Sequence, residues 1–193
     1  MSFVRGQAIE VTETARVRMV GSAFKKTGSP VVLVPLGKGV HAGHLALVQA
    51  AQRIRGGVVV VAVDTEDPAD ITALQAAQVD YLWRYTEEQL WPGGMRTLVQ
   101  PGCALLSDAA EISLALTRHL ALIGALGPSD VVVGEKDYEL LIALNQAVRD
   151  LHINTRVQGV PTVRMPDGLA LSLRNRKVEP SEREKASGLS AAL

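Results

Sequence analysis

The sequence predicts an α/β domain with a mostly parallel sheet that carries helices on both of its faces. Three runs rich in β-branched residues lead to this prediction, at residues 31–35 (VVLVP), 58–63 (VVVVAV) and 130–134 (DVVVG). Such runs indicate strands that are buried on both faces, because a strand with one wet face alternates apolar and polar residues. Segments with helical spacing lie between the runs, and this alternation is typical of parallel sheets.

The first half of the chain supplies strands and helices in alternation. The first strand, residues 31–35, ends in Pro and Gly, and residues 43–53 follow with Leu, Val and Ala at helical spacing. Gly56 and Gly57 then interrupt the chain before the second strand at residues 58–63. The next expected elements are an alanine-rich helix at residues 70–78 and strands at residues 80–83 and 96–100 (RTLVQ).

The second half continues the alternation. Asp108 and Glu111 form a capping box ahead of apolar residues at helical spacing, and Gly127 with Pro128 ends that helix. The strand at residues 130–134 comes directly after this stop. The later expected elements are a helix at 137–151, a strand at 156–160, a loop at 161–168, a turn-like segment at 172–177 and a polar helix from 181 onward.

Composition excludes several classes of partner and site. The 193 residues suit one domain, and the 20 basic and 20 acidic side chains give no net charge that would recruit nucleic acid or an anionic membrane. Cys103 is the single cysteine, so an internal disulfide and a thiolate-rich metal site are excluded. We expect no apolar run near the roughly 18 residues of a membrane span. The first ten residues resemble no secretory signal, so we expect a cytoplasmic protein.

The loop after the first strand is the first candidate site. It reads PLGKGVHAGH over residues 35–44, and Gly39 and Gly43 permit a close approach of the backbone to a ligand. His41 and His44 are three residues apart at a helix start, so both rings can face one ligand. Contact with phosphate is the favoured interpretation, since imidazole can stabilise negative charge there. Two alternatives stay open: half of a metal site, and plain helix capping.

Four stretches carry a resemblance to a known family. HxGH after a first strand is the hallmark of the HIGH-type nucleotidyltransferase superfamily. VVVGEKDYELL (residues 131–141), GVPTVRMPDGLALSLRNRKVEP (159–180) and LWPGGMRTLVQPG (90–102) are similar in order and spacing to stretches of pantothenate synthetase. The resemblance covers residues 31–193 and implies a Rossmann-like, doubly wound sheet in one nucleotide-binding domain at residues 1–193.

The resemblance implies an ATP-dependent ligase that joins a small carboxylic acid to an amine. In that family pantoate is adenylated by ATP with loss of pyrophosphate, and β-alanine then attacks the acyl-adenylate. ATP and Mg²⁺ are therefore the expected cofactors, and a homodimer is the expected assembly. Trp83, Tyr85 and Trp91 are either anchors of that interface or packed in the core or at its rim.

The resemblance also assigns roles to residues of this chain. His41, His44, Lys136 and Arg174 match the catalytic residues that contact phosphate, and Arg supplies a bidentate fork there. The other matches are the ATP-binding positions Gly39, Gly43, Gly134, Asp137, Val163 and Ser172. No metal ligand is expected from the protein. A simpler interpretation makes Lys136 and Asp137 a surface ion pair and Arg174 part of a solvated loop.

Departures from the family concentrate on the acid. The stretch that follows the second strand, AVDTEDPAD at residues 62–70, lacks the glutamine that binds pantoate. Glu139 and Leu140 replace two further amides, so the acid-binding residues are unknown and the acid is either pantoate or another acid. The family's RPxHFxGV element has no counterpart. The chain ends at Leu193, near the start of the family's C-terminal lid domain, so we expect that domain to be absent or truncated.

Three functions are therefore weighed. The first is the AMP-forming acid–amine ligase. The second is a non-catalytic relative that binds a nucleotide or associates with a genuine pantothenate synthetase. The third is an adenylyltransferase of the wider HxGH superfamily, which the GEKD and GVPTVR stretches argue against.

Overall fold

A single parallel sheet forms the centre of the molecule. The structure is a computed structural model that describes residues 3–102, 105–172, 175, 182 and 188. In this part of the chain six strands pair in the order β1-β4-β3-β2-β5-β6, and every neighbouring pair is parallel. The strands are β1 (Ile9–Val11), β2 (Val31–Leu36), β3 (Val58–Val63), β4 (Tyr81–Arg84), β5 (Asp130–Gly134) and β6 (Arg156–Val160). The predicted α/β fold is confirmed.

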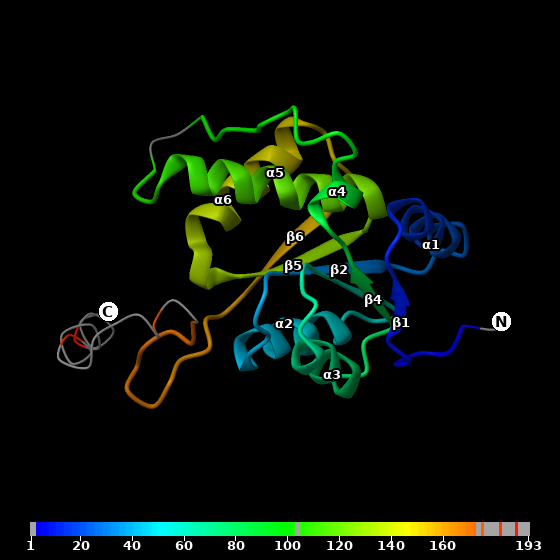
Figure 1. The fold of residues 1–193 in the computed structure, drawn as a ribbon. Helices are drawn as coiled ribbons and strands as arrows, with labels where there is room; N and C mark the ends of the chain where they lie inside the picture. Colours follow the sequence, from blue (N-terminus) through cyan, green and yellow to red (C-terminus); the bar gives the residue numbers. More distant parts are fainter. Residues whose placement is uncertain (1–2, 103–104, 173–174, 176–181, 183–187, 189–193) are drawn as a thin grey trace.

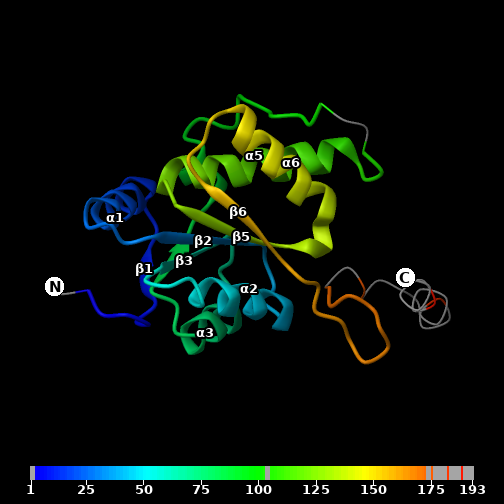
Figure 2. The ribbon, with the colours of Figure 1, turned by 180° about the vertical axis from the view of Figure 1, so that it is seen from behind.

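Helices cover both faces of the sheet, as Figures 1 and 2 show from opposite sides. One face carries α1 (Thr14–Lys26), α5 (Ala109–Leu126) and α6 (Tyr138–Asp150), and the other carries α2 (Ala42–Gln52) and α3 (Pro68–Ala76). Two apolar clusters match these two layers. All six residues of β3 are buried, because alternate side chains enter the two clusters. The short α4 (Glu87–Leu90) and a 3-10 turn at Glu135–Asp137 complete the described elements.

The strand order fixes where a ligand can bind. The chain runs from β2 through β3 to β4 on one side, then returns to add β5 and β6 on the other side of β2. Neighbouring loops at the carboxyl ends of β2 and β5 therefore lead to opposite faces of the sheet. A crevice opens at such a switch point in doubly wound sheets. The loop of residues 37–41 and the Glu135–Asp137 turn both start there.

Several expectations about single elements are wrong. Residues 96–100 are not a strand; the Val99 N–H donates instead to the Thr117 hydroxyl of α5, at 2.9 Å. Neither β1 nor α1 is predicted by the sequence pattern. β1 has only three residues, and α1 buries only Val17 and Gly21 completely. Both elements therefore lack the long apolar pattern from which the other strands and helices are predicted.

Helix α5 corrects the expectation that no apolar run approaches the length of a membrane span. Its 18 residues are long and apolar enough to cross a membrane by length and composition alone. In this structure, however, α5 packs between the sheet, α1 and α6, and Leu116, Leu122 and Ile123 are buried in the core. Asp108 caps its start and Gly127 ends it in a left-handed conformation, both as predicted. It is thus a core helix of this fold.

Two of the three aromatic residues weighed as interface anchors belong to the core. Trp83 is fully buried and Tyr85 is 4% exposed, and their rings lie 5.7 Å apart between centroids. Burial raises the pKa of the Tyr85 hydroxyl to about 12, so it stays protonated.

Candidate functional site

A cavity of about 200 Å³ lies at the switch point between β2 and β5. We call it the site cavity. Polar side chains from α2 and from the turn after β5 meet there, together with residues 161–163 and Leu171 from the chain after β6. Its lining residues are Pro35, Gly37, His41, Gly43, His44, Leu47, His119, Val133, Gly134, Lys136, Asp137, Leu140, Leu141, Val160, Pro161, Thr162, Val163 and Leu171.

His41 is both a site residue and the N-cap of α2. Its Nδ1 accepts a hydrogen bond from the Gly43 N–H at 3.1 Å, which satisfies one of the amides left open at a helix start. Gly43 is required by this arrangement, because a Cβ at residue 43 would come within 2.9 Å of Cε1 in the His41 ring. The expected plain capping role is therefore real for His41, and it coexists with a position in the site cavity.

His44 stacks on His41, with ring centroids 3.9 Å apart and 17° between the planes. Burial lowers the pKa of His44 to about 4, the charge of His41 and Lys136 adds to this, and Asp70 and Asp137 oppose it. His44 is therefore neutral at pH 7. Its Nδ1 is buried without a hydrogen-bond partner among the described residues. An orphaned buried polar atom is costly, and a ligand or water commonly completes it.

Asp70 supports the loop that precedes the histidines. Its buried carboxylate accepts hydrogen bonds from the Gly39 N–H (2.9 Å), the Val40 N–H (2.6 Å) and the Thr65 hydroxyl (2.8 Å). Burial alone would raise the pKa of Asp70, but these hydrogen bonds outweigh burial and leave the pKa below its usual value. The sequence pattern places Asp70 at a helix start and at the end of an acidic stretch, and nothing in the spacing reveals its contact with Val40, 30 residues earlier.

The turn after β5 brings a cation to the same cavity. Gly134, Lys136 and Asp137 all line it. Lys136 Nζ lies 3.1 Å from Asp137 Oδ1, and these side chains are 29% and 52% exposed. The ion pair of the simpler interpretation therefore exists, and it stands inside the candidate site rather than elsewhere on the surface. A partly exposed pair of this kind contributes little to stability and can exchange partners.

The chain after β6 supplies the last part of the site. Residues 163–171 fold back on themselves through a bridge between Arg164 and Ala170, and the Val163 carbonyl accepts from the Leu171 N–H at 2.8 Å. Val163 lines the site cavity, whereas Ser172 and Gly39 are not among the residues that line it. Arg174 lies outside the described residues, as does Cys103.

The residues that replace the family's acid-binding amides, and the acidic stretch after β3, lie in different places. Leu140 lines the site cavity. Glu139 turns away from it, and its carboxylate accepts from the Leu106 and Ser107 amides at 2.6 and 2.8 Å. The acidic stretch after β3 borders a different hollow of about 720 Å³, where Lys38 Nζ lies 3.9 Å from Asp64 Oδ2. These carboxylates do not line the site cavity, so they would not repel a carboxylic acid that binds there.

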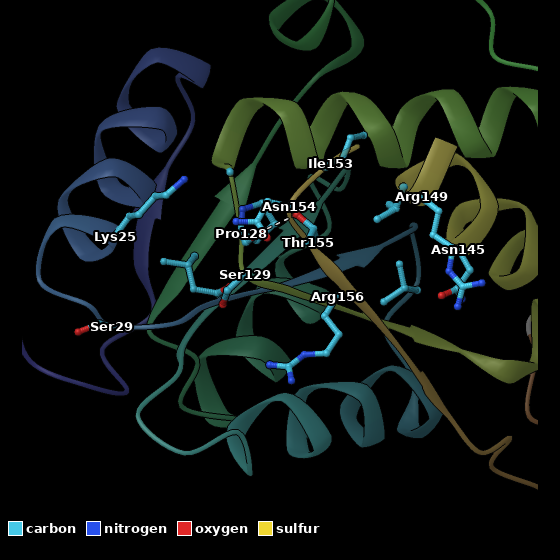
Figure 3. A pocket seen from close by; sticks show the side chains of 14 residues that line it. Lys25, Ser29, Pro128, Ser129, Asn145, Arg149, Ile153, Asn154, Thr155 and Arg156 are labelled. Carbon is cyan, nitrogen blue, oxygen red and sulfur yellow. Dashed lines mark hydrogen bonds between the residues drawn. The ribbon is translucent and has the colours of Figure 1, made fainter. Parts of the chain in front are cut away.

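A larger groove of about 660 Å³ lies at the opposite end of the strands (Figure 3). We call it the far groove. Lys25, Arg149 and Arg156 surround it, close to Gly127 and Leu151, where α5 and α6 end. Lys25 and Arg149 stand in the last turns of α1 and α6, where a cation balances the partial negative charge of a helix C-terminus. Arg156 Nε donates to the buried Asp130 carboxylate at 2.8 Å, so all three cations are explained without a ligand. The histidines, Lys136 and the strand carboxyl ends are all elsewhere, so chemistry points to the site cavity despite its smaller volume.

No group of three or more His, Cys, Asp or Glu side chains in the described ranges could hold a metal ion. Any divalent cation in the site would therefore depend on the ligand for most of its coordination. Phosphate oxygens are the usual partners of Mg²⁺ in such sites, with few protein ligands.

This chain is similar to known proteins along nearly its whole length. A family model described as pantoate-beta-alanine ligase matches residues 9–193. Pantothenate synthetase of Mycolicibacterium vanbaalenii is 40% identical over 99% of this chain and 68% of its own length. The crystal structure of pantothenate synthetase from Thermus thermophilus matches with TM-score 0.80 and 33% identity, over 96% of this chain and 73% of its own. Pantoate-beta-alanine ligase from Francisella tularensis, complexed with beta-gamma ATP and beta-alanine, matches with TM-score 0.81 and 26% identity, over 95% and 78%.

Proposed function

This chain belongs to the pantoate-beta-alanine ligase family, and on that premise we propose that it is an AMP-forming ligase of a small carboxylic acid and an amine. ATP and β-alanine, which accompany the Francisella tularensis structure, are the proposed nucleotide and amine. One observation carries the proposal: His41, His44 and Lys136 meet in a single cavity at the carboxyl ends of the strands. The non-catalytic and adenylyltransferase alternatives receive no support from these relatives.

The reaction requires positioning and charge neutralisation more than covalent chemistry. The acid carboxylate attacks the α-phosphorus of ATP and pyrophosphate leaves; the amine then attacks the acyl carbon and AMP leaves. Lys136 offers a positive charge to the phosphates, and the neutral His44 offers a ring N–H. Gly43 and Gly134 line the cavity without a side chain, so a ligand can approach their backbone closely. Ser172 and Arg174 stay proposed phosphate contacts by resemblance alone.

The site fits a nucleotide on grounds of its own. Lys136 brings a positive charge to the cavity, and Nδ1 of His44 has no hydrogen-bond partner among the described residues; both features suit an anionic, hydrogen-bonding ligand. We propose that Mg²⁺ accompanies ATP, because one lysine alone does not neutralise the charge of a triphosphate. We also propose a homodimer in the cytoplasm, and sedimentation of the purified chain tests the dimer.

Pyrophosphate release measures the proposed activity. The protein is incubated with ATP, Mg²⁺, β-alanine and one acid at a time from a panel that begins with pantoate. We expect release that depends on both the acid and ATP. Lys136→Ala and His44→Ala are expected to lower kcat/KM by roughly 100-fold or more, which is typical of losing one group that stabilises transition-state charge. Arg149→Ala, in the far groove, is the matched control and should leave kcat/KM unchanged.

The outcomes separate the alternatives. Calorimetry that detects ATP binding while no acid supports pyrophosphate release would favour the non-catalytic relative. Loss of activity in Arg149→Ala with full activity in Lys136→Ala would move the site to the far groove and refute the proposal.

A further inference from the structure

The segment of residues 64–70, directly after β3, is joined to the loop of residues 37–41. None of its residues lines the site cavity, and several of them border the separate hollow of about 720 Å³. The segment meets the loop through Asp70, whose carboxylate accepts from the Gly39 and Val40 amides at 2.9 and 2.6 Å. Any role of this segment in the reaction therefore has to pass through the loop.

The backbone of the loop is shaped to meet this carboxylate. Gly39 has a φ of 76°, in the left-handed region that glycine adopts without strain. The successive amides of Gly39 and Val40 converge on one carboxylate, an arrangement that in many proteins holds a phosphate or another anion. Here the side chain of Asp70 takes that place, and it fixes the backbone immediately before His41.

Thr65 holds Asp70 in this orientation. Thr65 is 8% exposed, and its hydroxyl donates to Asp70 Oδ2 at 2.8 Å. The same oxygen accepts from the Gly39 amide, whereas Oδ1 accepts from the Val40 amide, so the hydroxyl helps to fix the plane of the carboxylate relative to both amides. Thr65 Oγ1 also accepts from the Asp67 N–H at 3.2 Å, which holds the hydroxyl itself in place.

The loop passes its position on to the two histidines of the site cavity. Val40 directly precedes His41, whose Nδ1 caps α2 and whose ring stacks on His44 with the centroids 3.9 Å apart. A displaced loop therefore moves His41, and the stacking contact carries the displacement to His44. Both rings line the site cavity. Misplacement of a group that stabilises transition-state charge lowers the rate even when the ligand still binds.

We propose that Thr65 is a positioning residue for the reaction, which aligns the loop of residues 37–41, and with it His41 and His44, through Asp70. Thr65 does not line the site cavity, so it acts only through the carboxylate and the loop. This inference rests on the proposed ligase function. It gives the acidic stretch after β3 a task other than binding the acid.

Thr65→Val tests this inference, because it removes the hydroxyl and keeps the size of the side chain. We expect kcat for pyrophosphate release to fall by roughly 10-fold, less than the roughly 100-fold of a full 1 Å displacement. The KM for ATP should stay nearly unchanged, since the histidines act on charge that develops in the transition state. Thr65→Ser keeps the hydroxyl and should recover most of the lost kcat, and Thr65→Ala is a second variant without it.

Thr72→Val is the matched control. Thr72 stands in α3, and its hydroxyl donates to the Pro68 carbonyl oxygen at 2.7 Å, one turn earlier in the same helix. This bond has no connection to the loop of residues 37–41, so kcat should stay unchanged. Thermal unfolding of every variant measures whether it is folded at the temperature of the assay.

A spectroscopic readout decides the inference without turnover. The ring signals of His41 and His44 are recorded by ¹H–¹³C NMR on the folded protein without substrate. They should shift in Thr65→Val, return toward the wild-type positions in Thr65→Ser and stay in place in Thr72→Val. His152, which follows the end of α6, is the internal reference and should not shift in any variant. A wild type that releases no pyrophosphate with any acid contradicts the proposed function, whereas these signals still decide the role of Thr65.

Three results would overturn the inference. The first is a folded Thr65→Val or Thr65→Ala variant whose His41 and His44 signals stay in place. The second is a Thr65→Ser variant that is as impaired as Thr65→Val, because the hydroxyl would then not be the group that matters. The third is a loss of thermal stability with an unchanged kcat, which would make Thr65 a structural residue at the start of α3 alone.

Discussion

Replacement of Asp70 by alanine tests how the HxGH loop is held in place. The change removes the common acceptor of the Gly39 amide, the Val40 amide and the Thr65 hydroxyl. A hydrogen bond to a charged group contributes about 1.5–3 kcal/mol, and three bonds on one carboxylate are not additive. The two amides are only partly buried and regain some water. We therefore expect the free energy of unfolding to fall by about 2–4 kcal/mol, measured by urea denaturation.

The same variant should lose activity beyond its loss of stability. Without Asp70 the loop of residues 37–41 is free to shift, and a displacement of about 1 Å at a reacting group costs on the order of 100-fold in rate. Asp67→Ala is the matched control. Asp67 caps α3, the helix that contains Asp70, by accepting from the Ala69 N–H at 2.9 Å, and it makes no hydrogen bond to the loop of residues 37–41. It should cost about 0.5–2 kcal/mol and leave kcat/KM for pyrophosphate release unchanged. Full activity in Asp70→Ala, or equal loss in both variants, would refute the reasoning.

The pH dependence of stability gives an independent check on Asp70. Its pKa in the folded protein is lower than in the unfolded chain, where the usual value is 3.8. The carboxylate therefore stabilises the fold at pH above 3.8, and this contribution is lost as the pH falls through the folded pKa. The stabilities of wild type and Asp70→Asn should approach each other in that acidic window.

Three other perturbations have defined outcomes. Gly21→Ala places a Cβ against the Leu126 carbonyl oxygen and should lower the free energy of unfolding by about 1–3 kcal/mol in urea denaturation. Gly124→Ala, whose Cβ meets nothing within 4 Å, should not destabilise the fold. The pKa of His44 is about 4 in the folded protein and has its usual value of 6.5 in the unfolded chain, so unfolding takes up a proton between pH 4 and 6.5. The free energy of unfolding should therefore fall as the pH drops from 6.5 to about 4, and it should fall less in His44→Gln. Glu139→Ala should speed hydrogen exchange at the Leu106 and Ser107 amides and leave the Val99 amide, bonded to Thr117, unchanged.

The sequence predicts those parts of the molecule whose cause is local. The run at residues 58–63 has to be a buried strand because no polar residue offers a wet face, and β3 has those bounds. His41, Gly43 and His44 are recognisable as a site because glycines and histidines coincide at one helix start. Lys136 joined them only through the resemblance, and the structure accounts for this by bringing the end of β5 beside β2.

Contacts between distant segments are what the sequence conceals. The bond between Asp70 and the Gly39 amide joins residues that no periodicity relates. The place of His119 in the lining of the site cavity depends on which side of α5 faces it, and a helix that is apolar on nearly every side gives no such direction. Residues 96–100 have the composition of a strand, but the Val99 amide donates to the Thr117 hydroxyl of α5 and pairs with no strand.

The cap that His41 places on α2 has a consequence for how this motif can change. A side chain at residue 43 is obstructed by the imidazole ring and by nothing in the nearby backbone except the Leu171 carbonyl, at 4.0 Å. Alanine at residue 43 therefore clashes as long as residue 41 is histidine. The clash disappears when a smaller capping residue, such as serine, replaces His41. The two positions are mutationally coupled, and the order of the changes matters, since only the path that alters residue 41 first avoids a clashing intermediate.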